Sequence, residues 1–214
     1  MTEQTTPIGS IWALGLAEFR DRTASDAPTP GGGSAAMVAA ATGCGLILMA
    51  LRVTAHRPET GDRLAPLIEA GERRLEDLSE HADADIRVFE SYMAALKLPK
   101  GTEEQIATRR RALADAAQAA TEVPLNAAQT ALETLDLAFR AADLAHKGIV
   151  SDVAAGADLV HGALIAVLWN VDINLKSIKD DGLRTEYATS RAHLQTAGDS
   201  RHAAIRRLIG ERLA

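Results

Sequence analysis

Apolar positions along this chain recur every three or four residues, and no alternating pattern lasts long enough to predict a β-strand. The strongest stretch, residues 35–51, contains neither a charge nor a proline, and its Ala and Gly residues fall on every helical face. A helix that is apolar all round belongs at the centre of a fold. We therefore predict a central helix over residues 34–56 with Ser34 as its N-cap.

A second long helix is predicted over residues 62–96, bent near Pro66 and Gly71, after a break at Pro58 and Gly61. One of its faces carries a stripe in which steps of three and four alternate, as in a coiled-coil seam. The stripe consists of Leu75, Leu78, Ala82, Asp85, Phe89, Tyr92 and Leu96. One helix face is therefore apolar except for a single carboxylate.

The other predicted helices cover, in chain order, residues 10–26, 102–123, 124–146, 151–177 and 183–214. Ser10 is the expected cap of the first of them. Pro124 marks either a kink or the first turn of a new helix, and Asp181-Gly182 is a predicted turn. The fold class is therefore all-α, a helical bundle around an Ala/Gly-rich helix, with residues 1–214 as a single domain.

Composition narrows the possible partners. Aromatic residues make up 3% of the chain, the net charge is −6, and the basic residues are scattered, so no nucleic-acid surface is expected. Cys44 is the single cysteine, which excludes an intramolecular disulfide and favours a reducing compartment. Residues 1–10 lack the features of a signal peptide, and 35–51 is short for a membrane span, so we expect a cytoplasmic protein with no membrane partner.

Three consecutive glycines, Gly31, Gly32 and Gly33, precede the central helix. Glycine runs are costly in backbone entropy, so they are kept where φ is positive or where two backbones approach closely. Free N–H groups at the positive end of a helix form an anion site. The alternative is a tight packing turn ahead of a core helix.

Asp85 is the strongest candidate for chemistry. A carboxylate inside an apolar stripe must be paired, hydrogen-bonded or protonated, and such groups are often functional. Alternatively, Asp85 anchors a neighbouring helix N-terminus or an arginine. Asp83 lies on another face of the helix, and His81, one turn before Asp85, either orients that carboxylate or is solvated.

Asn170 and Asn174 lie one turn apart on an otherwise apolar helix. Each amide both donates and accepts a hydrogen bond, which suits the edge of a heterocycle, although buried asparagines also fix helix register. Ser151 and Asp152 at the start of that helix are consistent with a simple cap.

Basic residues at two helix ends are candidates for binding the anionic tail of a ligand. Alternatively, they are simply solvated charges. They are Lys97, Lys100, Arg52 and Arg57. The sequence has no metal-ligand spacing and no phosphate-binding or dinucleotide fingerprint, so we expect no metal and no such cofactor.

Six segments along the chain form a recognisable series. They are Pro28-Thr29-Pro30-Gly31-Gly32-Gly33-Ser34, Asp83-Ala84-Asp85 followed by Phe89, Leu98-Pro99-Lys100-Gly101-Thr102, Val123-Pro124-Leu125, Ser151-Asp152, and Asn170-Val171-Asp172-Ile173-Asn174. Together they resemble the cyclodeaminase/cyclohydrolase family of folate one-carbon enzymes. Their order and spacing match over nearly the whole chain. The resemblance implies an up-and-down helical bundle, a homodimer, and a tetrahydrofolate site near the glycine loop.

The resemblance implies a methenyltetrahydrofolate cyclohydrolase, with Asp85 as base or cation stabiliser and Asp152 as second catalytic candidate. Asn170 and Asn174, together with Ser151, would bind the folate. The segment 31–34 and Lys100 would meet a carboxylate or orient the substrate, and no cofactor beyond the folate would be required.

Two departures from the family pattern keep other functions open. The chain has Ala55-His56-Arg57-Pro58 where the family usually has a basic, Tyr-containing segment, and His146-Lys147-Gly148 where Gly-Asn is common. The alternatives are formiminotetrahydrofolate cyclodeamination, with release of ammonia, and a folate-binding protein without catalysis.

Overall fold

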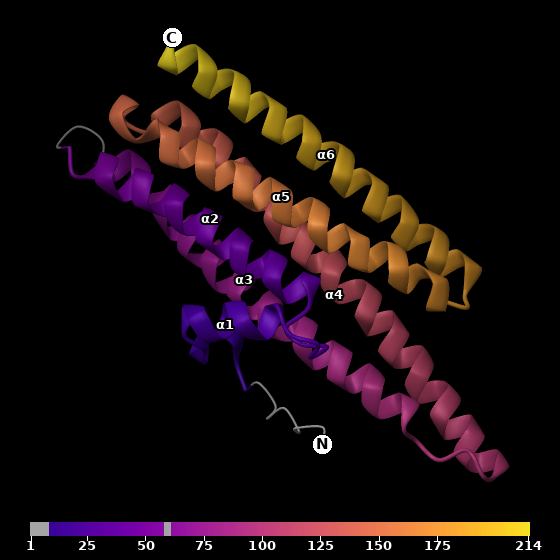
Figure 1. Ribbon diagram of the computed structural model, residues 1–214. Coiled ribbons are helices and arrows are strands. Elements are labelled where there is room, and N and C mark those ends of the chain that lie inside the picture. The colour runs from indigo at the N-terminus through magenta and orange to yellow at the C-terminus, as the bar shows by residue number, and fades with distance from the viewer. Residues whose placement is uncertain (1–8, 58–60) are drawn as a thin grey trace.

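The structure is a computed structural model that describes residues 9–57 and 61–214 (Figure 1). Within these residues it contains α-helices and short 3₁₀ helices but no β-strand, which confirms the predicted fold class. The α-helices are α1 (Leu16–Thr23), α2 (Gly32–Ala55), α3 (Gly61–Leu96), α4 (Glu103–Leu144), α5 (Val150–Asn174) and α6 (Asp181–Leu213). The 3₁₀ helices are η1 (Ile11–Ala13), η2 (Lys147–Ile149) and η3 (Leu175–Ser177).

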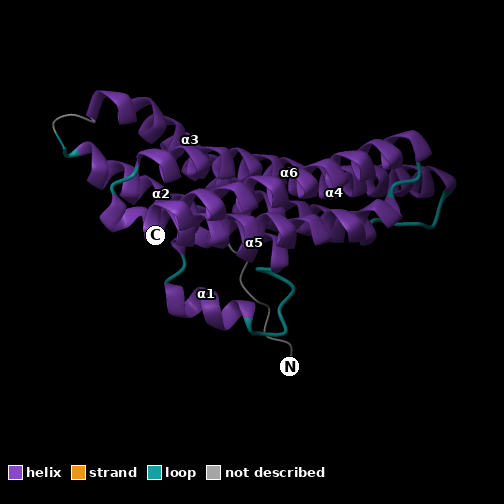
Figure 2. Ribbon diagram, turned by 90° about the horizontal axis from the view of Figure 1, so that it is seen from above, coloured by secondary structure: helices purple, strands orange, loops and turns teal. Residues whose placement is uncertain are grey.

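The five long helices, α2 to α6, run up and down beside one another, and the short helix α1 lies apart on one side of them (Figure 2). Helix α2 packs against α3 and α5, α4 packs against both α3 and α5, and α6 covers α4 and α5. The helices α2, α3, α4 and α5 therefore form a ring of four neighbours, with α6 as an outer helix against α4 and α5.

Helix α2 is the central helix that its composition predicts. Cys44, Ile47 and Leu51 on it are fully buried. Its crossing with α5 is a backbone contact, because a Cβ added to Gly156 would lie 2.5 Å from the carbonyl oxygen of Gly43. By length and hydropathy alone α2 would also pass for a membrane span, but 61% of its apolar window is buried against the rest of the bundle.

The predicted starts of two helices are wrong. Gly31, with an extended backbone, is the N-cap of α2, so Ser34 lies inside the first turn. Asp180 caps α6 through its side chain, which places Asp181 and Gly182 within the helix instead of in a turn. In both cases a residue one to three positions earlier supplies the extended backbone that a cap requires.

The helix predicted over residues 10–26 is two elements. Ser10 caps η1 as expected, accepting a hydrogen bond from the Trp12 N–H, but the chain is extended at Leu14 and Gly15 before α1 begins. The predicted break at Pro58 lies outside the described residues. Helix α3 continues without interruption through Pro66 and Gly71.

No new helix begins at Pro124. This proline is buried inside α4, which runs unbroken for 42 residues. Proline lacks the N–H that would bond to the carbonyl four residues earlier, so a continuous helix needs another donor for that carbonyl. The structure supplies one from α5, in the pocket described next.

Candidate functional site

A pocket of about 390 Å³ opens where the start of α2 meets α3, α4 and the end of α5. The N-terminal turn of α2 provides its backbone wall, and three helices provide side chains. The lining residues are Pro28, Thr29, Gly31, Gly32, Gly33, Asp85, Val88, Phe89, Tyr92, Ala117, Ala120, Val123, Pro124, Asn170, Ile173, Asn174 and Ser177. Asp85 is the only ionisable acid or base among these described residues other than the Tyr92 phenol.

Gly33 is the point on which the pocket converges. A Cβ there would lie 2.2 Å from Asp85 Oδ1 and 2.4 Å from Asn170 Nδ2, so no residue with a side chain fits. Described glycines with positive φ are absent. Of the two reasons predicted for the glycine run, close approach is therefore the one that applies at Gly33. The carboxylate and the amide are neighbours because this residue has no side chain.

Asp85 occupies the N-terminus of α2 with its own carboxylate. Its Oδ2 accepts hydrogen bonds from the Ser34 N–H at 2.9 Å and from Ser34 Oγ at 2.7 Å. The predicted anion site thus holds an internal anion, and Asp85 does anchor a helix N-terminus. Asp85 is half-buried and lines the pocket.

The two oxygens of Asp85 have different surroundings. Oδ2 carries both hydrogen bonds from Ser34, which is itself fully buried. Oδ1 accepts no hydrogen bond from any residue in the described ranges. A carboxylate held through one oxygen has the other available for a ligand or a water molecule, which is the arrangement that a general base requires.

Asp83 and Asp85, two positions apart on α3, form hydrogen bonds with different segments of the chain. It accepts hydrogen bonds from Ser10 Oγ at 2.7 Å and from the Ile11 N–H at 2.8 Å, which ties η1 to α3. Asp83 is not among the pocket residues. The prediction that Asp83 and Asp85 face different ways is confirmed.

His81 does not orient Asp85. Its Nε2 lies 3.0 Å from Thr130 Oγ1 on α4. Because the Thr130 hydroxyl donates to the Asn126 carbonyl, His81 Nε2 must be the donor in this pair. Burial lowers the pKa of His81, and nearby Asp77 and Glu80 oppose that shift.

The His81 environment predicts a loss of stability in acid. The pKa is lowered in the folded chain, so its contribution is present above the ordinary value of 6.5 and is lost as pH falls through the folded pKa. The free energy of unfolding, measured in urea between pH 7.5 and pH 5, should fall less for H81Q than for the parent. H193Q, at an exposed position on α6, is the control and should behave like the parent. Parallel curves for H81Q and the parent would contradict this assignment.

Asn170 and Asn174 both reach the pocket, as their one-turn spacing predicts. Asn170 contacts the Gly33 position, and Asn174 Nδ2 donates to the Ala120 carbonyl at 2.5 Å. Asp172 between them faces α6, where both its oxygens pair with Arg191 at 2.8 Å. One helix segment therefore supplies pocket amides on one side and an interhelical ion pair on the other.

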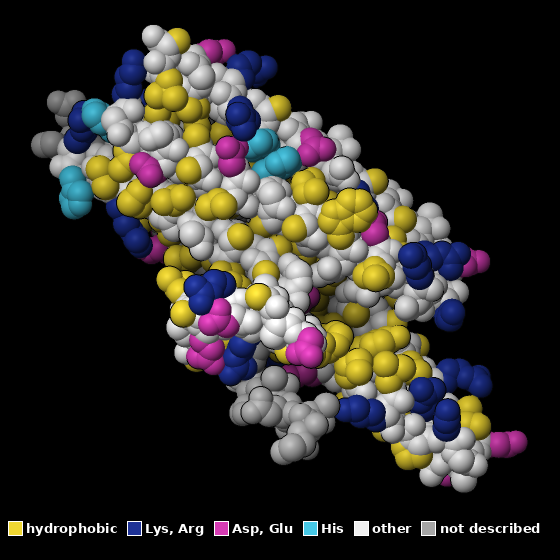
Figure 3. Space-filling view, viewed as in Figure 1, with side chains coloured by type: hydrophobic (Ala, Val, Ile, Leu, Met, Phe, Trp, Pro, Cys, Tyr) yellow, Lys and Arg dark blue, Asp and Glu magenta, His cyan; other side chains and the backbone are white. Residues whose placement is uncertain are grey.

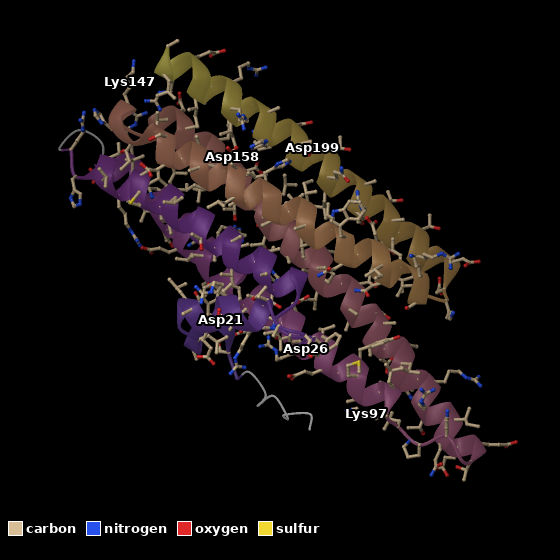
Figure 4. All side chains as sticks on the ribbon, viewed as in Figure 1. Asp21, Asp26, Lys97, Lys147, Asp158 and Asp199 are labelled. Atoms are coloured by element: carbon tan, nitrogen blue, oxygen red, sulfur yellow. The ribbon has the colours of Figure 1, made fainter. Side chains whose placement is uncertain are left out.

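Three other candidate residues lie away from this pocket. Ser151 and Asp152 are at the opposite end of α5, roughly 27 Å along the helix from Asn170. Lys100 follows the end of α3, and that end lies about 16 Å along the helix from Asp85. Figure 4 labels their neighbours Lys147 and Lys97, which lie at opposite ends of the bundle. None of the three is among the lining residues.

The aromatic and proline residues of the pocket are not among the site residues that the sequence predicts. Phe89 and Tyr92 lie on the same stripe as Asp85, so helical periodicity puts them on one face with it. Pro124 predicts only a kink or a helix start, and its place in the pocket wall depends on tertiary packing. The signal was thus present for the two aromatics and absent for Pro124.

A family model described as formiminotransferase-cyclodeaminase matches residues 15–193 of this chain. A methenyltetrahydrofolate cyclohydrolase from Methylorubrum extorquens is 32% identical over 78% of this chain and 82% of its own length. The chain belongs to the formiminotransferase-cyclodeaminase family.

Two other family members show that this domain also occurs within a longer protein and that its fold is shared. The formimidoyltransferase-cyclodeaminase of Sus scrofa is 31% identical over 87% of this chain, which spans 35% of the length of that relative. The crystal structure of formiminotetrahydrofolate cyclodeaminase from Thermotoga maritima superposes with a TM-score of 0.83, at 25% identity, over 94% of this chain and 98% of that one. The folding unit is therefore shared by stand-alone and fused members.

The two departures from the family pattern lie together and outside the pocket. The segment 55–57 ends α2, and 146–148 precedes α5, where the His146 N–H donates to Thr54 Oγ1 at 3.0 Å. Both are at the far end of α2 and α5 from Gly33 and Asn170. Within one chain they do not alter the lining of the pocket.

Proposed function

We propose that this protein hydrolyses 5,10-methenyltetrahydrofolate to 10-formyltetrahydrofolate. The observation that carries the proposal is the Asp85 carboxylate, fixed through Oδ2 by Ser34 and directed through Oδ1 into a pocket of aromatic and amide side chains. The substrate is a cation whose positive charge is shared between N5 and N10. A lone carboxylate in a half-buried pocket stabilises such a cation and accepts a proton from water.

The reaction follows from this arrangement. The oxygen of a water molecule bonds to the carbon between N5 and N10 while Asp85 Oδ1 accepts one of its protons. The bond from that carbon to N5 then breaks, and N5 takes a proton. The carbon remains on N10 as a formyl group, and one proton is released to solvent.

The other pocket residues have binding roles in this proposal. Asn170 and Asn174 hydrogen-bond the pterin edge, and Phe89 and Tyr92 pack against its rings. The backbone at Gly31 and Gly32 forms the remaining wall. The described residues that line the pocket include no Lys or Arg, so the glutamate tail of the folate would extend out of it.

A spectrophotometric assay tests the proposal. Purified protein should remove the absorbance of 5,10-methenyltetrahydrofolate at a rate above the spontaneous one, without added metal or redox cofactor. The second candidate is formiminotetrahydrofolate cyclodeamination, supported by the Thermotoga maritima structure and the fused relatives. Ammonia release from the formimino substrate would favour that reaction, and tight folate binding with no turnover would favour a binding protein.

We also propose that the protein is a homodimer formed through one face of α2 and α5. On α5 an exposed seam has steps of four and three residues, namely Ala155, Leu159, Gly162, Ala166, Trp169 and Ile173. Trp169 and Ile173 are 65% and 63% exposed. In Figure 3, uncharged and hydrophobic side chains dominate the middle of the face over α2 and α5. Only 39% of the apolar window in residues 147–177 is buried within the chain.

Two glycines support a second copy as the partner on this face. A glycine inside a helix costs about 1 kcal/mol relative to alanine, so it usually has a packing reason. Gly43 and Gly156 have one within the chain, but a Cβ at Gly45 or Gly162 would meet nothing within 4 Å. Gly162 belongs to the exposed seam on α5, and Gly45 is half-buried on α2, one turn from the exposed Thr42 and Met49. A second helix pair that packs closely on this face would supply the missing reason.

A charge in the seam is expected to prevent dimer formation. A166E places a carboxylate in the middle of the apolar seam, where it would be desolvated by a partner. Light scattering should give the mass of a dimer for the parent and of a monomer for A166E. A203E, at an exposed position on α6, should leave the mass unchanged. A monomeric parent would refute the dimer. A dimeric A166E would show that the dimer does not form through this face.

The cytoplasmic location remains a proposal. Its support is the single cysteine, Cys44, which is buried as a free thiol.

A further inference from the structure

Pro124 leaves one backbone carbonyl of α4 without its usual hydrogen-bond donor. In a regular helix the N–H at this position would donate to the carbonyl of Ala120, and proline has no N–H. The Ala120 carbonyl faces the pocket region, and the donor that it receives comes from another helix. Asn174 Nδ2, at the end of α5, lies 2.5 Å from the Ala120 oxygen.

This contact fixes which way the Asn174 amide is turned. A carbonyl oxygen only accepts hydrogen bonds, so the group opposite it must be the NH₂ of Asn174. Rotating the amide by 180° would bring two oxygens together with no proton between them. Oδ1 of Asn174 is therefore the atom left for the pocket, which this residue lines.

We infer that Pro124 acts through the Ala120 carbonyl to lock Asn174 as a hydrogen-bond acceptor in the pocket. Asn174 then selects the edge of a heterocycle that presents an N–H or NH₂ donor, and it disfavours an edge that presents a lone pair. Without the lock the amide turns freely and accommodates both. Asn174 is thus the residue that binds the donor edge of the ligand, and Pro124 is the positioning residue that fixes the orientation of its amide.

The inference rests on the proposed function only for the identity of the ligand. A reduced pterin carries an exocyclic amino group and ring N–H groups, which are suitable donors for Asn174 Oδ1. The lock itself is a property of the folded chain. It can therefore be tested without substrate.

A double-mutant cycle tests the lock by stability. In the parent, N174A leaves the partly buried Ala120 carbonyl without its donor, and this loss should lower the free energy of unfolding. In a P124A background the backbone N–H of residue 124 supplies that donor, so the same substitution should have a much smaller effect. The midpoint and slope of urea unfolding give the four free energies.

N170A is the matched control for this cycle. Asn170 lines the same pocket on the same helix, but no hydrogen bond joins it to Ala120. Its effect should be the same in the parent and in P124A. Equal effects of N174A in the two backgrounds would overturn the inference.

Amide hydrogen exchange gives a direct readout of the orientation. In ¹⁵N spectra of the parent, the Asn174 side-chain NH₂ should exchange more slowly than that of Asn170. P124A should remove this difference, because the NH₂ loses its obligatory acceptor. Rapid exchange of the Asn174 NH₂ in the parent would contradict the lock.

Binding of tetrahydrofolate tests the recognition step. P124A is expected to weaken binding about twofold, because a freely turning amide must be fixed in one of two orientations when the ligand binds. N174A removes Oδ1 itself and should weaken binding more, up to about tenfold, the range for one lost hydrogen bond. Binding by N174A as tight as by the parent would overturn the recognition role. A positive stability cycle with no tetrahydrofolate binding by the parent would instead contradict the proposed function and leave the lock intact.

Discussion

Replacement of Asp85 by asparagine is expected to lower kcat for methenyltetrahydrofolate hydrolysis by about 10²- to 10⁴-fold, the usual contribution of a general base. The variant removes the negative charge and the basic oxygen from the pocket. The fold should survive, because an asparagine oxygen can still accept from the Ser34 N–H and Oγ that now bond to Oδ2. Initial rates at saturating substrate, with circular dichroism of the same sample, measure both effects.

Asp83→Asn is the matched control for this experiment. Asp83 lies on the same helix, and it too accepts a backbone N–H and a serine hydroxyl, from Ile11 and Ser10. It is absent from the pocket. D83N should lose about 1 kcal/mol of stability, as expected for a charge-assisted hydrogen bond, with kcat close to that of the parent. If D85N also loses only stability while its folded fraction remains active, Asp85 is an anchor and not a base.

Gly33→Ala is expected to disrupt both the fold and the site. The added methyl would lie 2.2 Å from Asp85 Oδ1 and 2.4 Å from Asn170 Nδ2, well inside contact distance. Relief of this overlap must shift α2 against α3 and α5, at a cost of roughly 1–3 kcal/mol. Because the same shift separates the carboxylate from the amide, activity should fall further than stability alone explains.

Gly32→Ala provides the stability control for G33A. A Cβ at Gly32 meets nothing within 4 Å, so G32A should unfold at the same urea concentration as the parent or slightly higher. Thermal and urea unfolding of the two variants compare them directly. Parent-like stability in G33A would mean that Asp85 and Asn170 can move apart freely, and the convergence of the pocket on Gly33 would then have no functional meaning.

The pattern of small and apolar residues was enough to place α2 at the centre of the bundle. Ala and Gly on every face allow several helices to approach one axis, and nothing but burial suits such a surface. The stripe on α3 was similarly informative, because helical spacing alone puts Asp85, Phe89 and Tyr92 on one face. Because the geometry of the α-helix is regular, the sequence of one helix is enough to tell which of its side chains share a face.

The helix boundaries and the hydrogen-bond partners of these side chains depended on contacts between segments far apart in the chain. Ser34 resembles an N-cap in sequence, but its hydroxyl serves Asp85 from the inside of the turn. Pro124 resembles a helix end, but Asn174 supplies the donor that lets α4 continue. Each outcome turns on a hydrogen bond between segments far apart in the chain, and local propensity carries no information about it.

By itself the sequence determined that the chain is helical, that α2 is its core, and that Asp85 and the two asparagines are its unusual polar residues. Only the tertiary structure decided that Asp85 and Asn170 meet at Gly33 and that Asn174 lines the same pocket, that Ser151, Asp152 and Lys100 do not join them within one chain, and which oxygen of Asp85 is available. The physical reason is that helical periodicity fixes directions around one axis. The distances between axes are set by how the side chains of different helices pack.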